Sequence, residues 1–291
     1  MKPAAFKYLR PESIGDALEL LSLHRDDARI IAGGQSLVPM LNFRIARYDF
    51  LIDINGISEL SYIKAESDSL RIGALTRYHT IESSTEVSDA APLLRDATKC
   101  VAHRPIRARG TIGGSLSHAD PAAEYPPVMI ALDAKFVVRS ALSQRSVQAA
   151  DFFTGIFSTV LEPDEMLTEI QIPRATSNHF FAIEEFSRRP GDLAVIGVVV
   201  NLGFSGKRVQ SARLVAFGLG GGPCRITEAE THLIGRELSQ EQVESASTAA
   251  ASISAQSDNN ATSELRKKLA CVLTRRALLK VSSAQMGQQD E

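Results

Sequence analysis

Apolar residues along the first hundred positions fall into short runs with either helical or strand spacing. Behind Ser13, which can cap a helix, apolar residues three or four positions apart predict a helix over residues 14–21. Residues 29–32 are a short β-branched run that ends at a Gly-Gly pair. We therefore predict a strand, a glycine turn and then a helix over residues 36–41 capped by Ser36.

The pattern continues with strands and helices mixed through the middle of the chain. Strands are predicted at residues 50–54 and 70–74, and a helix at residues 92–103, where apolar residues share one side. We predict a second helix over residues 122–132, with Pro126 and Pro127 near its start. A strand at residues 135–138 and an alternating edge strand at residues 166–173 complete a region of α+β character.

The last hundred residues separate into strands first and helices afterwards. A polar segment at residues 174–178 is predicted to be a linker. Three β-rich runs follow at residues 180–188, 194–204 and 208–219, which indicate an antiparallel sheet. Helical spacing then covers residues 227–234, 239–254 and 261–281, and the polar residues 283–291 are expected to be a frayed tail.

Composition agrees with an ordinary globular protein. The 291 residues, 44% of them hydrophobic and 23% charged, are enough for two or three modest domains. With 32 Lys and Arg against 34 Asp and Glu, the net charge of −2 gives no basic excess for nucleic-acid binding. No window approaches the roughly 18–20 uncharged apolar residues that span a bilayer.

The three cysteines, Cys100, Cys224 and Cys271, lie far apart and form no Cys-x-x-Cys pair. Such a sparse, odd set is typical of reduced thiols in a cytoplasmic protein rather than of a disulfide framework. These cysteines alone cannot build a zinc or iron–sulfur site. We expect cytoplasmic localisation.

Two glycine pairs carry the chemistry that the pattern suggests. Gly33-Gly34 and Gly113-Gly114 each follow an apolar, β-type run and precede short polar residues. A diphosphate needs closely spaced backbone N–H donors with no side chains in the way, which paired glycines supply. Two such segments could hold one diphosphate between them.

Spacing alone leaves this interpretation open. Neither pair fits the Gly-x-Gly-x-x-Gly or Gly-x-x-x-x-Gly-Lys-Ser pattern, so neither known phosphate-loop geometry applies. A single Gly-Gly is more often only a tight turn. The residues by themselves therefore give an anion-binding candidate and no named cofactor.

The longer segments around these pairs resemble a known family. The segments Ala32-Gly33-Gly34-Gln35-Ser36 and Thr111-Ile112-Gly113-Gly114-Ser115-Leu116-Ser117-His118-Ala119-Asp120-Pro121-Ala122-Ala123-Glu124 look like the two FAD signatures of the medium subunits of carbon monoxide dehydrogenase and related bacterial molybdenum hydroxylases. The likeness covers essentially the whole chain. The flavin domain of eukaryotic xanthine dehydrogenase is a more distant relative.

The resemblance implies an α+β fold of the vanillyl-alcohol oxidase (PCMH) type. Two subdomains, at about residues 1–56 and 57–176, would form the FAD-binding domain. Residues 177–282 would form a C-terminal domain with a three-stranded antiparallel sheet and a helical bundle. The order of strands and then helices read from the sequence agrees with this.

The resemblance also implies the residues that bind FAD. The segments at residues 31–37 and 111–115 would wrap the pyrophosphate, Thr76, Ser117 and Asp120 would assist at the phosphate, ribitol or ribose, and Leu161 and Leu167 would pack against the ring system. The expected cofactor-binding residues are Ile31, Ala32, Gly33, Gly34, Gln35, Ser36, Leu37, Thr76, Thr111, Ile112, Gly113, Gly114, Ser115, Ser117, Asp120, Leu161 and Leu167.

By the same resemblance, the protein is an oxidoreductase subunit whose own chemistry is that of its flavin. The FAD would take electrons from two [2Fe-2S] clusters on a small partner subunit and pass them to an external acceptor. Substrate hydroxylation would occur at a molybdenum pterin cofactor on a large partner subunit, in a dimer of heterotrimers. Relatives often place a lysine or an aromatic residue near the flavin in the segment that here contains Glu184, Glu185 and Leu193.

Other functions remain open at this point. The chain could be a flavin-free scaffold subunit or a stand-alone flavin oxidase. The side chains His103, His118, Asp120 and Glu124 match no zinc spacing, so we predict no metal site. Asp120-Pro121 could equally well start a helix. The substrate and the final electron acceptor are not encoded in any motif of this chain.

Overall fold

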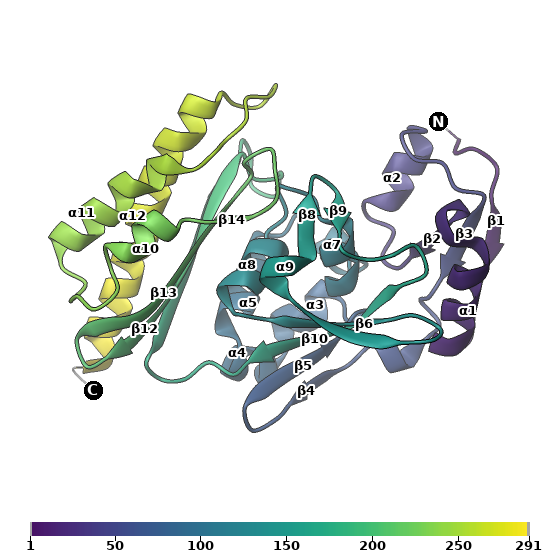
Figure 1. The fold of residues 1–291 in the computed structure, drawn as a ribbon, viewed down its shortest axis with the longest axis horizontal. Helices are drawn as coiled ribbons and strands as arrows, with labels where there is room; N and C mark the ends of the chain where they lie inside the picture. Colours follow the sequence, from purple (N-terminus) through teal and green to yellow (C-terminus); the bar gives the residue numbers. More distant parts are fainter. Residues whose placement is uncertain (1, 290–291) are drawn as a thin grey trace.

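The computed structural model describes residues 2–289, which are arranged in a row of three parts (Figure 1). The first lobe contains the parallel sheet β1–β3–β2, formed by Lys7–Leu9, Phe50–Asp53 and Ala28–Ile31. Helices α1 (Ile14–His24) and α2 (Leu37–Asn42) belong to this lobe. A single-turn 3-10 helix, Arg25–Asp27, joins α1 to β2.

Helix α1 begins where the sequence predicts. The Ser13 hydroxyl accepts from the Asp16 N–H at 3.1 Å, and the Asp16 carboxylate accepts from the Ser13 N–H, a complete capping box. Its apolar face packs onto β2 and β3 in one core cluster. Ser36, by contrast, directly precedes α2, but its side chain makes no capping hydrogen bond, so that part of the prediction is wrong.

The second lobe is built on an antiparallel sheet in the order β4–β5–β10–β6–β7. Its strands are Ile63–Ala65, Ser69–Gly73, Met166–Pro173, Lys135–Arg139 and Gln144–Gln148. The prediction of an edge strand at residues 166–173 is wrong, because β10 pairs with β5 on one side and β6 on the other. Pro173 is tolerated because it occupies the last position of the strand.

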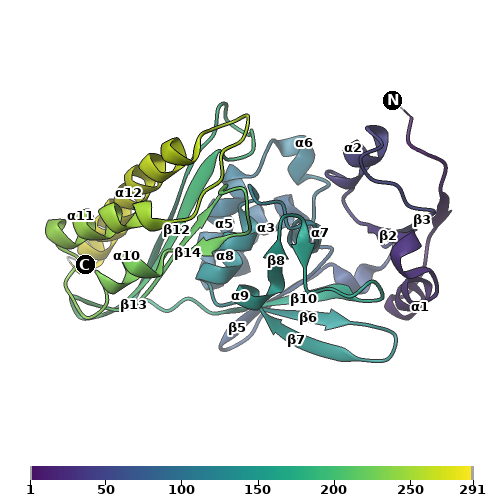
Figure 2. The ribbon, with the colours of Figure 1, turned by 45° about the horizontal axis from the view of Figure 1, so that its top comes forward.

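Short helices cover this sheet (Figures 1 and 2). They are α3 (Tyr78–Ser83), α4 (Thr85–Ala90), α5 (Pro92–Cys100), α6 (Arg104–Arg107), α7 (Ile112–His118), α8 (Tyr125–Ala131) and α9 (Ala149–Phe152), with the hairpin β8 (Phe153–Gly155) and β9 (Ser158–Thr159) and a 3-10 turn, Ser58–Leu60. Two predicted helices are shorter than expected. The chain leaves α5 at Val101, which has an extended ψ of 110°, and Ala102 then takes a left-handed conformation with φ of 40°; α8 begins only at Tyr125.

The C-terminal domain confirms the predicted order of antiparallel strands followed by helices. Its sheet runs β11 (His179–Phe186), β12 (Ile196–Ser205), β13 (Arg208–Phe217) and the two-residue β14 (Cys224–Arg225). The helices are α10 (Thr227–Thr231), α11 (Gln240–Ala249) and α12 (Ser263–Gln289), with a 3-10 turn at Ala250–Ser252. Helix α12 thus continues past residue 282, where the sequence suggested a tail. None of the helices within residues 2–289 combines the length and apolarity needed to cross a bilayer.

Strand β12 is buried on both faces, because one face packs against the C-terminal helices and the other against the second lobe. Ile196, Val198 and Val200 point into the cluster formed with α10–α12. Val199 lies in the core cluster of the second lobe, together with Phe217 of β13. The sheet is therefore the middle layer between the C-terminal helices and the second lobe, as Figure 1 shows. The α+β class expected from the sequence is confirmed.

Candidate functional site

The first glycine motif (residues 31–37) is the turn from β2 to α2. Gly34 has a φ of +72°, a left-handed conformation that other residues adopt only with strain. The Gly34 carbonyl accepts from the Val38 N–H at 3.0 Å, and the Gly33 carbonyl accepts from the Gln35 side chain at 2.9 Å. Within residues 2–289, the backbone N–H groups of residues 33–36 meet no acceptor. Four adjacent donors are therefore free for an anion.

The second glycine motif (residues 111–115) is the start of helix α7, where the sequence suggested a turn. Thr111 is the N-cap, and its hydroxyl accepts from the Gly114 N–H at 3.2 Å. A Cβ at Gly113 would lie 2.5 Å from the Ala74 Cβ and 2.7 Å from the Ala74 carbonyl oxygen. Gly113 is thus required for contact with the backbone after β5, while Gly114 is exposed.

Folding brings the two motifs together. A Cβ at Gly33 would lie 2.4 Å from the Arg109 carbonyl oxygen and 2.9 Å from the Gly110 Cα, in the two residues directly before Thr111. A Cβ at Gly114 would lie 4.0 Å from the Ala32 Cβ. The motifs are separated by about eighty positions in sequence and come from different lobes. In the fold they form adjoining walls.

A cleft of about 650 Å³ opens beside both motifs, within the size range of small-molecule and cofactor sites. It takes its lining from the first lobe, from α7 and the segment after it, and from residues 157–167. The predicted residues that line it are Ala32, Gly33, Gly34, Gln35, Ser36, Leu37, Thr111, Gly113, Gly114, Ser115, Ser117, Asp120, Leu161 and Leu167.

Three predicted residues lie outside this lining. Thr76 is 1% exposed, and its hydroxyl donates to the Tyr62 carbonyl at 2.9 Å. Ile112 is fully buried in the core of the second lobe. Ile31 is the last residue of β2, and its side chain lies 3.7 Å from the position of a Gly34 Cβ. These three residues support the motifs from behind.

Asp120 lines the cleft, and its carboxylate accepts from the Ala122 N–H at 2.9 Å. This is a local turn, and α8 begins five residues later with Glu124 at its N-cap. The suggestion that Asp120-Pro121 starts a helix is therefore wrong. Asp120 instead shapes the turn that follows α7.

Several further residues, outside the expected cofactor-binding set, line the cleft. His118 and Phe157 meet with ring centroids 4.9 Å apart at the tip of the β8–β9 hairpin. Leu193, from the loop before β12, reaches the same cleft, although it is 60% exposed. Glu124 also lines it. Glu124 ends the quoted motif, and its burial could be inferred only from the fold.

Two carboxyl groups near this cleft have raised pKa values. Burial, together with the charges of Glu185 and Asp120, raises the pKa of Glu124 to about 8. Burial raises the pKa of Glu185 to about 7, and its Oε2 meets no hydrogen-bond partner among the described side chains and backbone. Burial also lowers the pKa of His118. Below about pH 7, the raised pKa values therefore leave Glu124 and Glu185 largely protonated.

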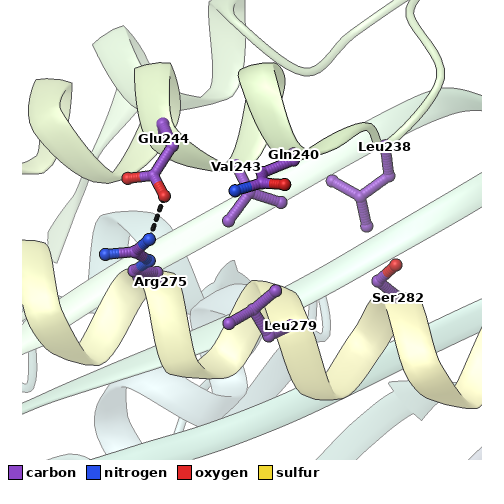
Figure 3. Close-up of a pocket in the computed structure, with 7 residues that line it drawn as sticks. All are labelled: Leu238, Gln240, Val243, Glu244, Arg275, Leu279 and Ser282. Carbon is purple, nitrogen blue, oxygen red and sulfur yellow. Dashed lines mark hydrogen bonds and ion pairs between the residues drawn. The ribbon is translucent and has the colours of Figure 1, made fainter.

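A second, smaller pocket lies between α11 and α12 in the C-terminal domain (Figure 3). Leu238, Val243 and Leu279 give it apolar walls, and Arg275 pairs with Glu244 across one end. It has no group of side chains suited to catalysis. Across residues 2–289, no cluster of three or more His, Cys, Asp and Glu side chains is placed to hold a metal ion.

The geometry fits an elongated ligand that carries a diphosphate. Free N–H donors line one wall, α7 presents its first turn on the other, and apolar residues extend the cleft toward Leu161 and Leu167. Residues 4–175 match the family model for the FAD binding domain in molybdopterin dehydrogenase. Residues 181–281 match that for the CO dehydrogenase flavoprotein C-terminal domain.

Relatives of similar length share most of the chain. It is 38% identical over 284 residues to the caffeine dehydrogenase subunit beta of Pseudomonas sp. CBB1, covering 97% of this chain and 96% of that protein. It is 42% identical over 252 residues to the 6-hydroxypseudooxynicotine dehydrogenase complex subunit alpha of Paenarthrobacter nicotinovorans, covering 86% and 85%. A carbon monoxide dehydrogenase from Hydrogenophaga pseudoflava, solved without the Mo-pyranopterin moiety of its molybdenum cofactor, matches with a TM-score of 0.95 and 36% identity over 97% of this chain and 99% of that one.

Proposed function

This chain belongs to the family of FAD-binding medium subunits of molybdenum hydroxylases, and on that premise we propose that it carries electrons from an iron–sulfur partner subunit to an external acceptor. When bound, FAD supplies the electron acceptance and release, which no side chain of the chain can provide. The protein's own part is to bind the flavin, orient it and keep water from it.

The free N–H groups of the first glycine motif carry this proposal. Residues 33–36 present four donors without an internal partner, and Gly33 lets this turn pack directly against the Arg109 backbone. Unsatisfied donors at a concave surface are costly unless a ligand or water meets them. A diphosphate bridge offers the acceptor oxygens that would satisfy them.

We assign supporting roles to the other lining residues. Gly114, Ser115 and Ser117 would approach the diphosphate and the sugar from α7, and Asp120 would meet a ribose or ribitol hydroxyl. Leu161 and Leu167 would pack against a ring. Thr76, Ile112 and Ile31 would act by fixing the backbone behind the two motifs.

We further propose the domain limits that the sequence suggested. Residues 1–176 would bind FAD, in two subdomains that meet near residue 56. Residues 177–282 would form the C-terminal domain. The change of sheet between β10 and β11 supports the boundary. The partners would be a large subunit with a molybdenum pterin cofactor, where substrate is hydroxylated, and a small subunit with two [2Fe-2S] clusters. Two heterotrimers would form the complete complex.

The segment near the flavin would give this member its own redox behaviour. Glu185 lies with one buried, unpaired carboxylate oxygen, and Leu193 lines the cleft. With its raised pKa, the Glu185 carboxyl holds a proton over part of the neutral range. A neutral carboxyl and a leucine beside the flavin would give it less positive surroundings than a lysine would.

The proposal is tested by coexpressing the chain with its two neighbouring subunits and purifying the complex. We expect flavin absorption bands, release of one FAD per chain on denaturation, and bleaching of those bands when the substrate of the large subunit is added. A complex that assembles without flavin would instead indicate a scaffold subunit. Substrate oxidation by the isolated chain would indicate a stand-alone oxidase.

A further inference from the structure

Hydrogen bonds behind the two glycine motifs connect the first and second lobes. The Arg77 guanidinium donates to the Asn55 side-chain oxygen at 2.6 Å and to the Arg109 carbonyl. Asn55 follows β3 in the first lobe, while Arg77 is the N-cap of α3 in the second. One side chain therefore spans the junction between the lobes.

Both ends of this connection touch the glycine motifs. The Asn55 side-chain nitrogen donates to the Ala32 carbonyl at 2.7 Å, directly before Gly33. The Arg109 carbonyl, which accepts from Arg77, is the atom that lies closest to the Gly33 Cβ position. Arg77 thus links two backbone segments. It reaches the segment before Gly33 through Asn55, and it bonds directly to the segment before Thr111.

Further contacts hold the two ends in place. Asp53, 9% exposed, accepts from the Asn55 N–H at 2.9 Å and from the Asn55 side chain at 2.5 Å, and it also accepts from the Tyr8 hydroxyl. Arg77 forms an isolated backbone bridge with Thr111. Both side chains are therefore oriented before any ligand binds.

Other contacts between the lobes among the described residues, such as the close approach of Gly33 to the Arg109 backbone, add no hydrogen bond of fixed direction. Leu75 and Met166 join the apolar cluster of the first lobe, and hydrophobic contact is not directional. The ion pair of Arg25 and Asp164, at 3.4 Å, lies on the surface, where such pairs contribute little. The planar fork of an arginine, in contrast, fixes the angle between its two acceptors.

We propose that Arg77 and Asn55 form an interlobe latch that sets the separation of the two glycine motifs and thereby the affinity for the diphosphate of FAD. They are positioning residues, because neither Arg77 nor Asn55 lines the cleft. This inference rests on the proposed function only for the identity of the ligand. The latch itself is a property of the chain without flavin.

The first experiment measures the FAD dissociation constant of the reconstituted full chain with Arg77→Met, Asn55→Ala and the double variant. Loss of one charge-assisted hydrogen bond is expected to weaken binding about tenfold to a hundredfold. The double variant should bind FAD no more weakly than the single variant with the lower affinity, since either change opens the same latch. If the losses of FAD affinity in the two single variants multiply in the double variant, the proposal is overturned.

Arg95→Met is the matched control. Arg95 also donates to one backbone carbonyl, of Glu82 at 3.2 Å, and to one side-chain oxygen, of Ser88 at 2.9 Å, but all three residues lie in the second lobe. We expect similar losses of thermal stability in the two variants but weaker FAD binding only in Arg77→Met. Equal losses of affinity, or a change below about twofold in Arg77→Met, would show that the latch does not exist.

A second measurement needs no flavin. Spin labels at Leu23→Cys in α1 and at Leu142→Cys between β6 and β7, both highly exposed, report the distance between the lobes when the three native cysteines are replaced by serine. Arg77→Met should broaden the distance distribution of the flavin-free chain, and Arg95→Met should not. If the wild-type chain fails to bind FAD but Arg77→Met still broadens the distribution, the proposed function is refuted and the latch is kept. An unchanged distribution in Arg77→Met would refute the latch.

Discussion

At the scale of single residues, the glycines of the two motifs are required for different reasons. Gly33 and Gly113 let backbone segments touch, Gly34 takes a left-handed conformation, and Gly114 faces solvent. Only the first motif offers a run of free N–H groups. A substitution therefore tests packing or ligand binding according to its position.

Gly113→Ala should destabilise the chain even without flavin. The added Cβ would lie 2.5 Å from the Ala74 Cβ, and overpacking of this kind costs about 1–3 kcal/mol, more than alanine returns in helix propensity. The melting temperature of the flavin-free chain measures it. Gly221→Ala is the control, since nothing lies within 4 Å of its Cβ position and its φ is not positive. Equal melting temperatures for the two variants would contradict the packing argument.

The carboxyl of Glu124 predicts a pH dependence of stability. Its pKa is about 8 in the folded chain, against 4.5 for the unperturbed group, so the folded state holds the proton more tightly between these values. The free energy of unfolding should therefore fall as the pH rises through this window, by up to about 1.4 kcal/mol per pH unit. Urea unfolding at about pH 5 and about pH 8 measures the fall, and Glu124→Gln should reduce it. A wild-type curve as flat as that of the variant would argue against a buried, protonated Glu124.

At the scale of elements, helix α12 and the loop before β12 are held by one buried arginine. Arg266 is 3% exposed and donates to the carbonyls of Val195 at 3.2 Å and of Gln256, and to the Asp258 carboxylate at 2.7 Å. Val195 is two residues from Leu193 of the cleft. The side chain thus connects the C-terminal helix to the rim of the flavin site.

Arg266→Met should lower the free energy of unfolding by about 3–5 kcal/mol, since it leaves buried acceptors unsatisfied. Lys268→Met is the control. Lys268 pairs with Glu264 on the surface of the same helix, with its side chain 72% exposed, and such pairs contribute little. Chemical denaturation of both variants measures the difference. Similar losses would show that burial of the guanidinium is unimportant.

The elements that the sequence predicts well are those with a local signal. The Ser13 cap and the spacing behind it define α1, and the β-branched run at residues 198–200 defines β12. Three-residue strands such as β1 have too few residues for a pattern. The sequence did not predict helix α7, because its two glycines disfavour a helix locally. The Thr111 cap and packing against Ala74 stabilise the helix in the fold.

The site was predictable where it depends on motif residues and not where it depends on tertiary packing. Most residues of the two motifs line the cleft, but Thr76 and Ile112 face the interior. Whether a side chain points to the cleft or to the core depends on lobe packing, which sequence spacing does not encode. Glu124 reaches the cleft for the same reason.

At the scale of the whole molecule, the C-terminal sheet completes the second lobe. Val199, Val215 and Phe217 are buried in the core of that lobe, and Asn201 donates to the Ala131 carbonyl at 2.9 Å. The Gly218 N–H donates to the Pro121 carbonyl at 2.8 Å, just beyond α7. The domain carries no part of the glycine motifs but supports the segment that follows the second one.

A fragment of residues 1–176 should therefore be poorly stable. It would expose the apolar face that β12 and β13 cover, and large exposed apolar surfaces lead to association. Size-exclusion chromatography and binding of a hydrophobic dye measure the effect, with removal of residues 287–291 alone as the control. A monodisperse fragment that melts like the full chain would contradict this role of the sheet.

The cleft takes its walls from residues as far apart as Leu21 and Leu193. During synthesis on the ribosome, two-thirds of the polypeptide must emerge before the last of these walls exists. FAD binding that uses the whole cleft therefore becomes possible only late in the synthesis of each chain.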